Sequence, residues 1–229
     1  MTLAITIVGL EPRRMGEEVE LTVKIAPEGS SDASRSDTRK LCVAAKMLFE
    51  IGNIGAGSLP YPLTREQFDS LDYSASLWEA VKKGLDLLSY GDNTKSTLVT
   101  KLRQRGFERY LSEDAADYIA ELGYIDESRI LARAVDSLAN VRLYGPSRIR
   151  NELRKKGISP EIIRDELPDL LEAVDFFGNL TRLVERKCDF SRLGDGKYRE
   201  SVYAAFYRLG YSPSETRAAI KQVQENNNE

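Results

Sequence analysis

Two clusters of basic side chains are the groups in this sequence best suited to bind another molecule. The first cluster is Lys101, Arg103 and Arg105, and the second is Arg142, Arg148, Arg150, Arg154, Lys155 and Lys156. Guanidinium and ammonium groups bind phosphates and carboxylates. The whole chain has a formal net charge of −3, so attraction to an anion has to come from such local clusters. Charge runs on helices are usually only solvated, however, and spacing alone favours that interpretation.

The sequence holds few groups for catalysis or metal binding. It has no histidine, which removes both the commonest general base and the commonest metal ligand. Its two cysteines, Cys42 and Cys188, are too few for a structural zinc site, and their surroundings differ. Free thiols in a reducing compartment explain them better than a disulfide. Serines such as Ser89 have no histidine to activate them. We therefore expect neither an enzyme nor a protein with a cofactor or metal ion.

Two further motifs have a structural interpretation. The stretch Gly52-Asn-Ile-Gly55-Ala-Gly57 is rich in glycine but lacks the Gly-Lys-Ser/Thr of a phosphate-binding loop, so we predict a plain turn. Tyr203, Tyr207 and Tyr211 recur at helical spacing and could stack on nucleobases. A place in the core is favoured for these tyrosines, because aromatic stripes on helices are more often buried.

The basic clusters belong to a repeated helical pattern. In each copy, two apolar residues four positions apart precede a basic run, a glycine and a large apolar residue. The copies end at Gly106-Phe107 and Gly157-Ile158, and a looser third copy ends at Gly210-Tyr211. A glycine directly after a helix adopts the left-handed conformation that ends it. The interval of roughly fifty residues between the glycines predicts a tandem repeat of three-helix units.

The start of the chain has a different pattern. Large apolar residues alternate with other residues in Leu3–Ile7 and with polar residues in Val19–Ile25, which predicts two paired strands. Gly29–Thr38 is predicted to be an exposed loop, and Leu41–Phe49 fits a helix or a strand equally well. The sequence therefore predicts a mostly α fold, in which three tandem three-helix repeats form an elongated array behind a small β-containing N-terminal region. The expected boundaries are 1–72 for the N-terminal region and 73–125, 126–168 and 169–229 for the repeats.

Capping motifs set the expected helix starts. Thr64 opens a capping box for a short helix that is expected to end near Leu71. Ser76 opens a second capping box, which predicts that a new helix begins there. Ser112 is expected to begin a later helix whose inner face includes Leu122.

Several motifs in the repeats match a known family. They include Gly123-Tyr-Ile-Asp-Glu127, Gly145-Pro-Ser-Arg-Ile149 and Lys155-Lys-Gly-Ile158, within the region from residue 77 to residue 224. With these motifs the chain resembles the RecX family, bacterial regulators of the RecA recombinase. The resemblance implies a cytoplasmic, non-enzymatic protein that lodges in the groove of the RecA–single-stranded-DNA filament. It implies inhibition of filament extension, ATP hydrolysis and strand exchange, and hence a role in recombination, DNA repair and the SOS response. It also favours a binding role for the basic clusters over simple solvation.

One turn departs from the family pattern. Relatives usually have an arginine-rich turn where this chain has Tyr90-Gly-Asp-Asn-Thr94. If the turn contacts the partner in relatives, the resemblance implies a weaker or displaced contact here.

Other interpretations remain open from the sequence. Three-helix units with a basic second helix also resemble helix-turn-helix modules that bind DNA directly, single- or double-stranded, although the net acidity opposes this. A helical-repeat scaffold without any link to nucleic acid is a third alternative. The apolar stretch Leu3–Leu10 is too short to span a membrane and has no basic residue before it, so no membrane association is expected. We expect a monomer.

Overall fold

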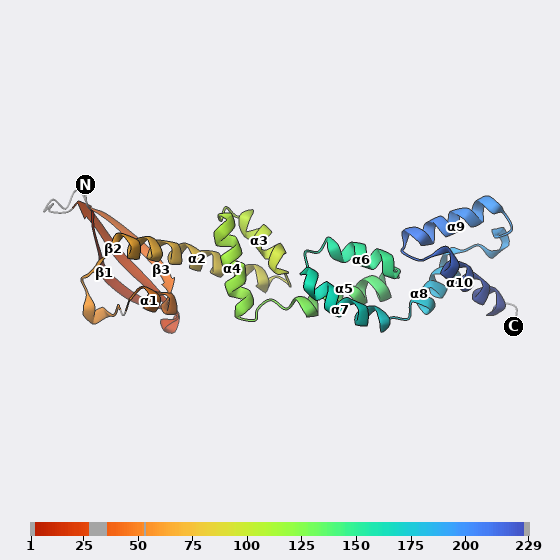
Figure 1. Ribbon diagram of the computed structural model, residues 1–229, viewed down its shortest axis with the longest axis horizontal. Helices are drawn as coiled ribbons and strands as arrows, with labels where there is room; N and C mark the ends of the chain where they lie inside the picture. The colour runs from red at the N-terminus through yellow and green to blue at the C-terminus, as the bar shows by residue number, and fades with distance from the viewer. Residues whose placement is uncertain (1–2, 28–35, 53, 227–229) are drawn as a thin grey trace. The chain divides into compact units, whose positions relative to one another are not determined.

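The computed structural model describes residues 3–27, 36–52 and 54–226 of the chain (Figure 1). The strands are β1 (Leu3–Arg13), β2 (Glu18–Pro27), β3 (Asp37–Ala44) and β4 (Tyr61–Leu63). The helices are α1 (Ala45–Ile51), α2 (Arg65–Ser89), α3 (Lys95–Arg103), α4 (Arg109–Glu121), α5 (Glu127–Asp136), α6 (Pro146–Arg154), α7 (Pro160–Glu172), α8 (Phe176–Lys187), α9 (Gly196–Arg208) and α10 (Pro213–Asn226). The prediction of a mostly α fold behind a small β-containing region is confirmed.

The strands form one antiparallel sheet in the order β3-β2-β1-β4. The predicted pairing of the first two strands is confirmed, with Ile7 opposite Val23. The ambiguous segment Leu41–Phe49 is partly strand and partly helix, because β3 ends at Ala44 and α1 begins at the next residue. The predicted loop Gly29–Thr38 is wrong at its end, since β3 begins at Asp37, and residues 28–35 lie outside the described residues.

The two helices predicted to begin at Thr64 and Ser76 form a single continuous helix, α2. The capping box at Thr64 is confirmed, because its side chain accepts a hydrogen bond from the backbone N–H of Gln67 at 3.1 Å. The helix does not end near Leu71, however, and no new helix begins at Ser76, whose hydroxyl instead donates to the carbonyl of Asp72. No glycine or proline interrupts this stretch, so the helix continues.

Helix α2 therefore serves two cores. Its first half buries Phe68 and Leu71 against the sheet, and its second half packs against α4 (Figure 1). At Gly84 a Cβ atom would lie 2.4 Å from the side chain of Ile119, so the glycine lets α4 approach closely. The continuous helix thus ties the β-containing region to the first three-helix repeat.

Two details of α4 differ from the sequence-based expectation. The helix begins at Arg109, and Ser112 lies inside it, with its hydroxyl donating to the carbonyl of Glu108 at 2.9 Å. Leu122 is not on the inner face: it is 49% exposed, because the helix ends at Glu121 and Leu122 is its C-cap.

The three glycines expected to end the second helix of each repeat all have left-handed backbones. Their φ angles are +93° at Gly106, +69° at Gly157 and +97° at Gly210. We call these residues the glycine C-caps. The residue after Gly106 and the residue after Gly210 fold back over the helix end. The N–H of Phe107 donates to the carbonyl of Leu102 at 3.4 Å, and that of Tyr211 donates to the carbonyl of Phe206 at 3.1 Å. The repeated pattern read from the sequence is confirmed as a repeated structure.

The chain divides into two compact units. One is Met1–Gly91 with Leu98–Tyr124, and the other is Asp92–Thr97 with Ile125–Glu229. The second unit has two apolar cores: one among α5, α6 and α7, centred on Leu131, and one among α8, α9 and α10, centred on Phe206. The domain boundaries expected from the sequence stay predictions.

Candidate partner-binding surface on α6

Helix α6 presents most of the second basic cluster to solvent. Pro146 occupies its first turn, and Ile149 and Leu153 face the core with no exposed surface. Arg150 and Arg154 on the helix, and Lys155 and Lys156 directly after it, are all exposed, and we call these four the α6 basic surface. The helix C-terminus carries partial negative charge, which favours cations there.

Three members of the α6 basic surface have free charged groups. Among the residues that the structure describes, no carboxylate forms an ion pair with Arg150, Arg154 or Lys156. Lys155 is held only loosely, since its ammonium group lies 3.4 Å from Glu152 and its side chain is 71% exposed. Such an exposed pair contributes little and is easily exchanged for an external anion.

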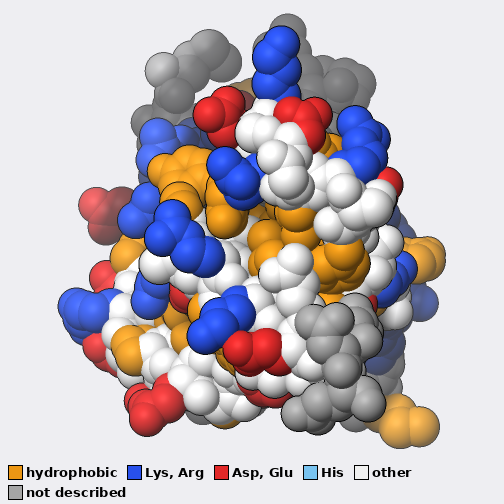
Figure 2. Space-filling model, turned by 90° about the vertical axis from the view of Figure 1, so that its right-hand side faces the viewer, with side chains coloured by type: hydrophobic (Ala, Val, Ile, Leu, Met, Phe, Trp, Pro, Cys, Tyr) orange, Lys and Arg blue, Asp and Glu red, His pale blue; other side chains and the backbone are white. Residues whose placement is uncertain are grey.

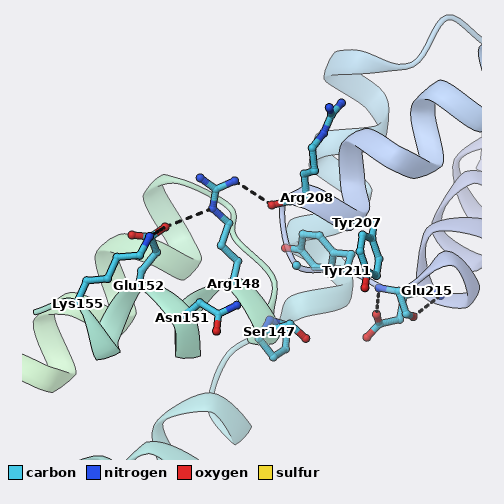
Figure 3. Close-up of a pocket in the computed structure, with 12 residues that line it drawn as sticks. Ser147, Arg148, Asn151, Glu152, Lys155, Tyr207, Arg208, Tyr211 and Glu215 are labelled. Atoms are coloured by element: carbon cyan, nitrogen blue, oxygen red, sulfur yellow. Dashed lines mark hydrogen bonds and ion pairs between the residues drawn. The ribbon is translucent and has the colours of Figure 1, made fainter.

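Arg148 has internal contacts that the α6 basic surface lacks, and its predicted role in partner binding stays a prediction. Its guanidinium donates to the carbonyl of Arg208 at 2.8 Å and lies 3.8 Å from Glu152 (Figure 3). The same group lies over the ring of Tyr144, 4.1 Å from its centroid. Its side chain is only 32% exposed. Arg148 thus connects the second repeat with the third, and the geometry gives it less freedom to bind a partner than the α6 basic surface has.

Arg142 lies beside the end of α6. Together with Lys155 and Lys156 it lines a cleft of about 200 Å³ that also includes Glu152. Arg142 follows a π-helical turn at Ser137–Val141, and the backbone then turns sharply at Leu143, whose φ is +54°. The hydroxyl of Tyr211 donates to the carbonyl of Leu143 at 3.2 Å and holds this turn in place. The structure therefore places Arg142 in the same cleft as Lys155 and Lys156. The sequence had grouped them only because they lie near one another in the chain.

The C-terminal end of α6 is fixed by residues far away in the sequence. The carbonyl of Lys156 accepts hydrogen bonds from the hydroxyls of Thr94 and Thr97 at 3.4 and 3.5 Å. The carboxylate of Glu127 accepts one backbone N–H from Lys95 at 2.9 Å and another from Ser159 at 2.7 Å. The beginnings of α3 and α7 are thus joined next to the basic residues.

The first basic cluster is less free. The guanidinium of Arg105 donates to the carbonyl of Lys101 at 3.1 Å, so it caps its own helix. Lys101 is half-buried, and Arg103 is exposed and makes no ion pair with a carboxylate of the described residues. This cluster belongs to the first compact unit and the α6 basic surface to the second.

Two residues near α6 stand outside the set of partner-binding residues predicted from the sequence. A cleft of about 510 Å³ lies between α6 and the α9–α10 turn, and its walls include Tyr207 and Arg208 (Figure 3). Tyr207 is 68% exposed, so the core position predicted for it is wrong, whereas Tyr211 is 1% exposed and confirms it. Arg208 stands two residues before its glycine C-cap, as Lys155 does, and that count could have identified it.

The turn Tyr90–Thr94, which departs from the family pattern, makes its contacts within the chain. The carboxylate of Asp92 lies 3.1 Å from the guanidinium of Arg129 and 2.7 Å from that of Arg133. Asn93 and Thr94 are buried. In this chain the turn consequently binds α5 of the following repeat.

The described part of the chain has neither a metal-binding cluster nor a membrane-spanning helix. No group of three or more Cys, Asp or Glu side chains there could hold a metal ion. No helix there is long and apolar enough to cross a membrane.

Comparisons with known proteins agree on one family. The family described as "RecX, second three-helix domain" matches residues 126–167, which contain α5, α6 and most of α7. The Regulatory protein RecX of Pseudomonas entomophila (strain L48) is 34% identical over 131 residues, which cover 57% of this chain and 83% of that protein. The protein of the same name from Ectopseudomonas mendocina (strain ymp) is 35% identical over 131 residues, covering 57% of this chain and 85% of the relative.

Solved structures share the fold. A crystal structure of regulatory protein RecX superposes with a TM-score of 0.68 at 21% identity, over 95% of this chain and 99% of the other. The crystal structure of RecX from Lactobacillus salivarius gives a TM-score of 0.52 at 18% identity, over 65% of this chain and 97% of the other. The motifs, the tandem three-helix repeats and the identity to relatives over most of their length lead to one conclusion: this chain belongs to the RecX family of regulatory proteins.

Proposed function

We propose that this protein binds the RecA–single-stranded-DNA filament through the α6 basic surface and limits filament extension, ATP hydrolysis and strand exchange. Family membership supports a regulatory role, and the resemblance supplies the RecA filament as the partner. The observation that carries the choice of surface is the set of three exposed cations, Arg150, Arg154 and Lys156, without an ion pair among the described residues.

The surface suits an acidic protein face. Its cations extend from the last turns of α6 into the following turn, on a helix whose opposite side is fixed in the core. Because side chains on a fixed helix lose little backbone entropy on binding, several modest ion pairs can add up. The positive charge is local, in a chain whose net charge is −3, which favours one oriented contact over general adhesion to nucleic acid.

The first basic cluster would add a second contact. A filament repeats its surface at regular intervals, and two linked weak contacts bind more strongly than either alone. Arg103 is the member of this cluster with an exposed, unpaired side chain among the described residues. Arg103→Ala should therefore weaken binding further when the α6 basic surface is already altered.

The test is RecA ATPase activity on single-stranded DNA in the presence of the protein. The variant in which Arg154, Lys155 and Lys156 are all alanine should inhibit less, and its thermal unfolding should stay nearly unchanged, because these side chains are exposed. The matched control replaces three exposed cations of the third repeat by alanine, namely Arg186, Lys187 and Lys197.

The two variants lose the same charge, so a general electrostatic effect would weaken both equally. The proposal expects the control to inhibit like the unaltered protein. Full inhibition by the α6 variant would refute the choice of surface. No effect of the unaltered protein on filament growth or ATPase would refute the function itself.

Direct DNA binding is the second candidate. The observation in its favour is the cleft where Arg142, Lys155 and Lys156 converge, since three cations suit a phosphate group. Glu152 lines the same cleft and counts against an anion there. A gel shift with DNA alone across a salt series separates the two functions: retention by DNA at physiological salt without RecA would favour direct binding.

A further inference from the structure

A second groove lies far along the chain from α6, in the third repeat. It has a volume of about 380 Å³ and is formed by the turn at Phe190–Arg192 with α9 and α10. Its apolar lining consists of Phe190, Leu193, Tyr203 and Ile220, which lie at the edge of the third-repeat core. No residue of the α6 basic surface lines it.

The charged residues that line this groove are all cations. Arg199, Arg217 and Lys221 line it, and no aspartate or glutamate does. In Figure 2, hydrophobic side chains gather in a central area of the face shown, with Lys and Arg side chains and some Asp and Glu side chains around them. In an acidic chain, a groove with an apolar floor and a purely basic rim is a distinct chemical environment.

The rim cations are available. Arg217 is exposed and forms no ion pair with a carboxylate of the described residues. Lys221 lies 3.5 Å from Glu225, but both side chains are more than half exposed, so the pair is weak. The guanidinium of Arg199 donates to the carbonyl of Leu193 at 3.4 Å, which uses one of its five N–H groups.

We propose that the groove between α9 and α10 binds an acidic, amphipathic protein segment. An apolar side chain of the segment would enter between Leu193 and Ile220, and flanking aspartate or glutamate side chains would pair with Arg199, Arg217 and Lys221. This binding site is separate from the α6 basic surface and does not depend on the function proposed above.

The floor of the groove favours a protein segment over a nucleic acid strand. Bases bind by stacking on exposed aromatic faces. Here the aromatic rings of Phe190 and Tyr203 are half-buried and pack against the third-repeat core, and the rest of the floor is aliphatic. Such a floor suits a leucine or phenylalanine side chain, and the rim suits carboxylates.

The test uses fluorescence anisotropy with a defined probe. The probe is a fluorescein-labelled peptide of twelve residues with two central leucines and one phenylalanine among glutamates. One control peptide has glutamine in place of every glutamate, and another has alanine in place of the apolar residues. The unaltered protein should bind the probe about tenfold more tightly than it binds either control, since charge and anchor both contribute.

Two protein variants carry the same change in charge. Arg217→Glu with Lys221→Glu reverses two rim cations and should weaken binding of the probe about tenfold. Arg186→Glu with Lys187→Glu makes the equal change on α8, outside the groove, and should leave the affinity within about twofold. The milder pair Arg217→Ala with Lys221→Ala, checked by circular dichroism, covers the case in which the reversal disturbs the fold.

Amide chemical-shift mapping with the same probe locates the contact. Shifts confined to residues 190–203 and 213–224 are the expected result. Equal binding by the rim variants and the unaltered protein would overturn the proposal, as would shifts centred on α6. Displacement of the probe by a fifteen-residue oligothymidine that itself binds more tightly would assign the groove to nucleic acid instead.

Discussion

Replacing Gly210 by alanine should destabilise the second unit strongly. The residue has a φ of +97°, a conformation that costs an alanine about 1–2 kcal/mol. An added Cβ would also lie 2.6 Å from the backbone nitrogen of Arg148 and 2.9 Å from the carbonyl oxygen of Gly145. Because backbone atoms cannot move aside easily, we assign about 1–3 kcal/mol to this overlap. The total of about 2–5 kcal/mol is a large part of a domain's stability.

Two other glycines separate the contributions. Gly157 also has a positive φ, of +69°, but the nearest atoms to an added Cβ belong to the small side chain of Ser96 at 3.2 Å, so Gly157→Ala should cost about 1–2 kcal/mol. Gly194 has an ordinary φ and open space around it, and Gly194→Ala should stay within about 0.5 kcal/mol. The expected loss of stability is therefore largest for Gly210→Ala, smaller for Gly157→Ala and smallest for Gly194→Ala.

Urea unfolding with two probes measures this series. The only tryptophan of the sequence, Trp78, lies in the first unit, so its fluorescence reports on that unit. Far-UV circular dichroism reports on both units. Gly210→Ala should lower the midpoint seen by circular dichroism and leave the Trp78 transition in place.

Two results would refute this reasoning. If Gly210→Ala costs no more than Gly194→Ala, the close approach of the second and third repeats is not a tight contact. If the Trp78 transition shifts as much as the dichroism signal, the cost does not arise within the second unit.

Three further measurements follow from local environments. Burial, and then a hydrogen bond to Asp114, raise the pKa of Tyr73 to about 12 from 10.0, so the folded state retains this proton longer than the unfolded state. The stability of the first unit, followed by Trp78 fluorescence, should therefore fall between pH 10 and 12, and less so in Tyr73→Phe. Glu127→Gln leaves one acceptor oxygen for two backbone N–H groups and should cost about 1–3 kcal/mol in urea unfolding. Burial raises the pKa of both Cys42 and Cys188, so iodoacetamide at pH 8 should alkylate them more slowly than it alkylates glutathione.

The features that the sequence predicted correctly depend on neighbours in the chain. A glycine C-cap needs only a helix before it and an apolar residue after it, so Gly106, Gly157 and Gly210 could be found by inspection. The two strands were found for the same reason, since alternation is a local pattern.

The errors arise where local signals compete with more distant packing. Ser76 has the sequence of a helix cap, but the helix around it continues because both halves of α2 have cores to pack against. The role of Arg148 depends on the carbonyl of Arg208, sixty residues later, and no local pattern predicts that contact. The partner-binding role predicted for Arg148 is a separate matter and stays a prediction.

The same long-range contacts explain why α6 can act as a rigid platform. At its first turn, the N–H of Gly145 donates to the carbonyl of Leu209 at 2.7 Å, which fixes the helix against the third repeat. Just after its last turn, the hydroxyl of Thr94 donates to the carbonyl of Lys156 at 3.4 Å. A helix held at both ends presents its cations in one arrangement, so binding costs only the ordering of side chains. If this is the purpose of the contacts, Thr94→Val should weaken partner binding while every cation of the α6 basic surface is still present.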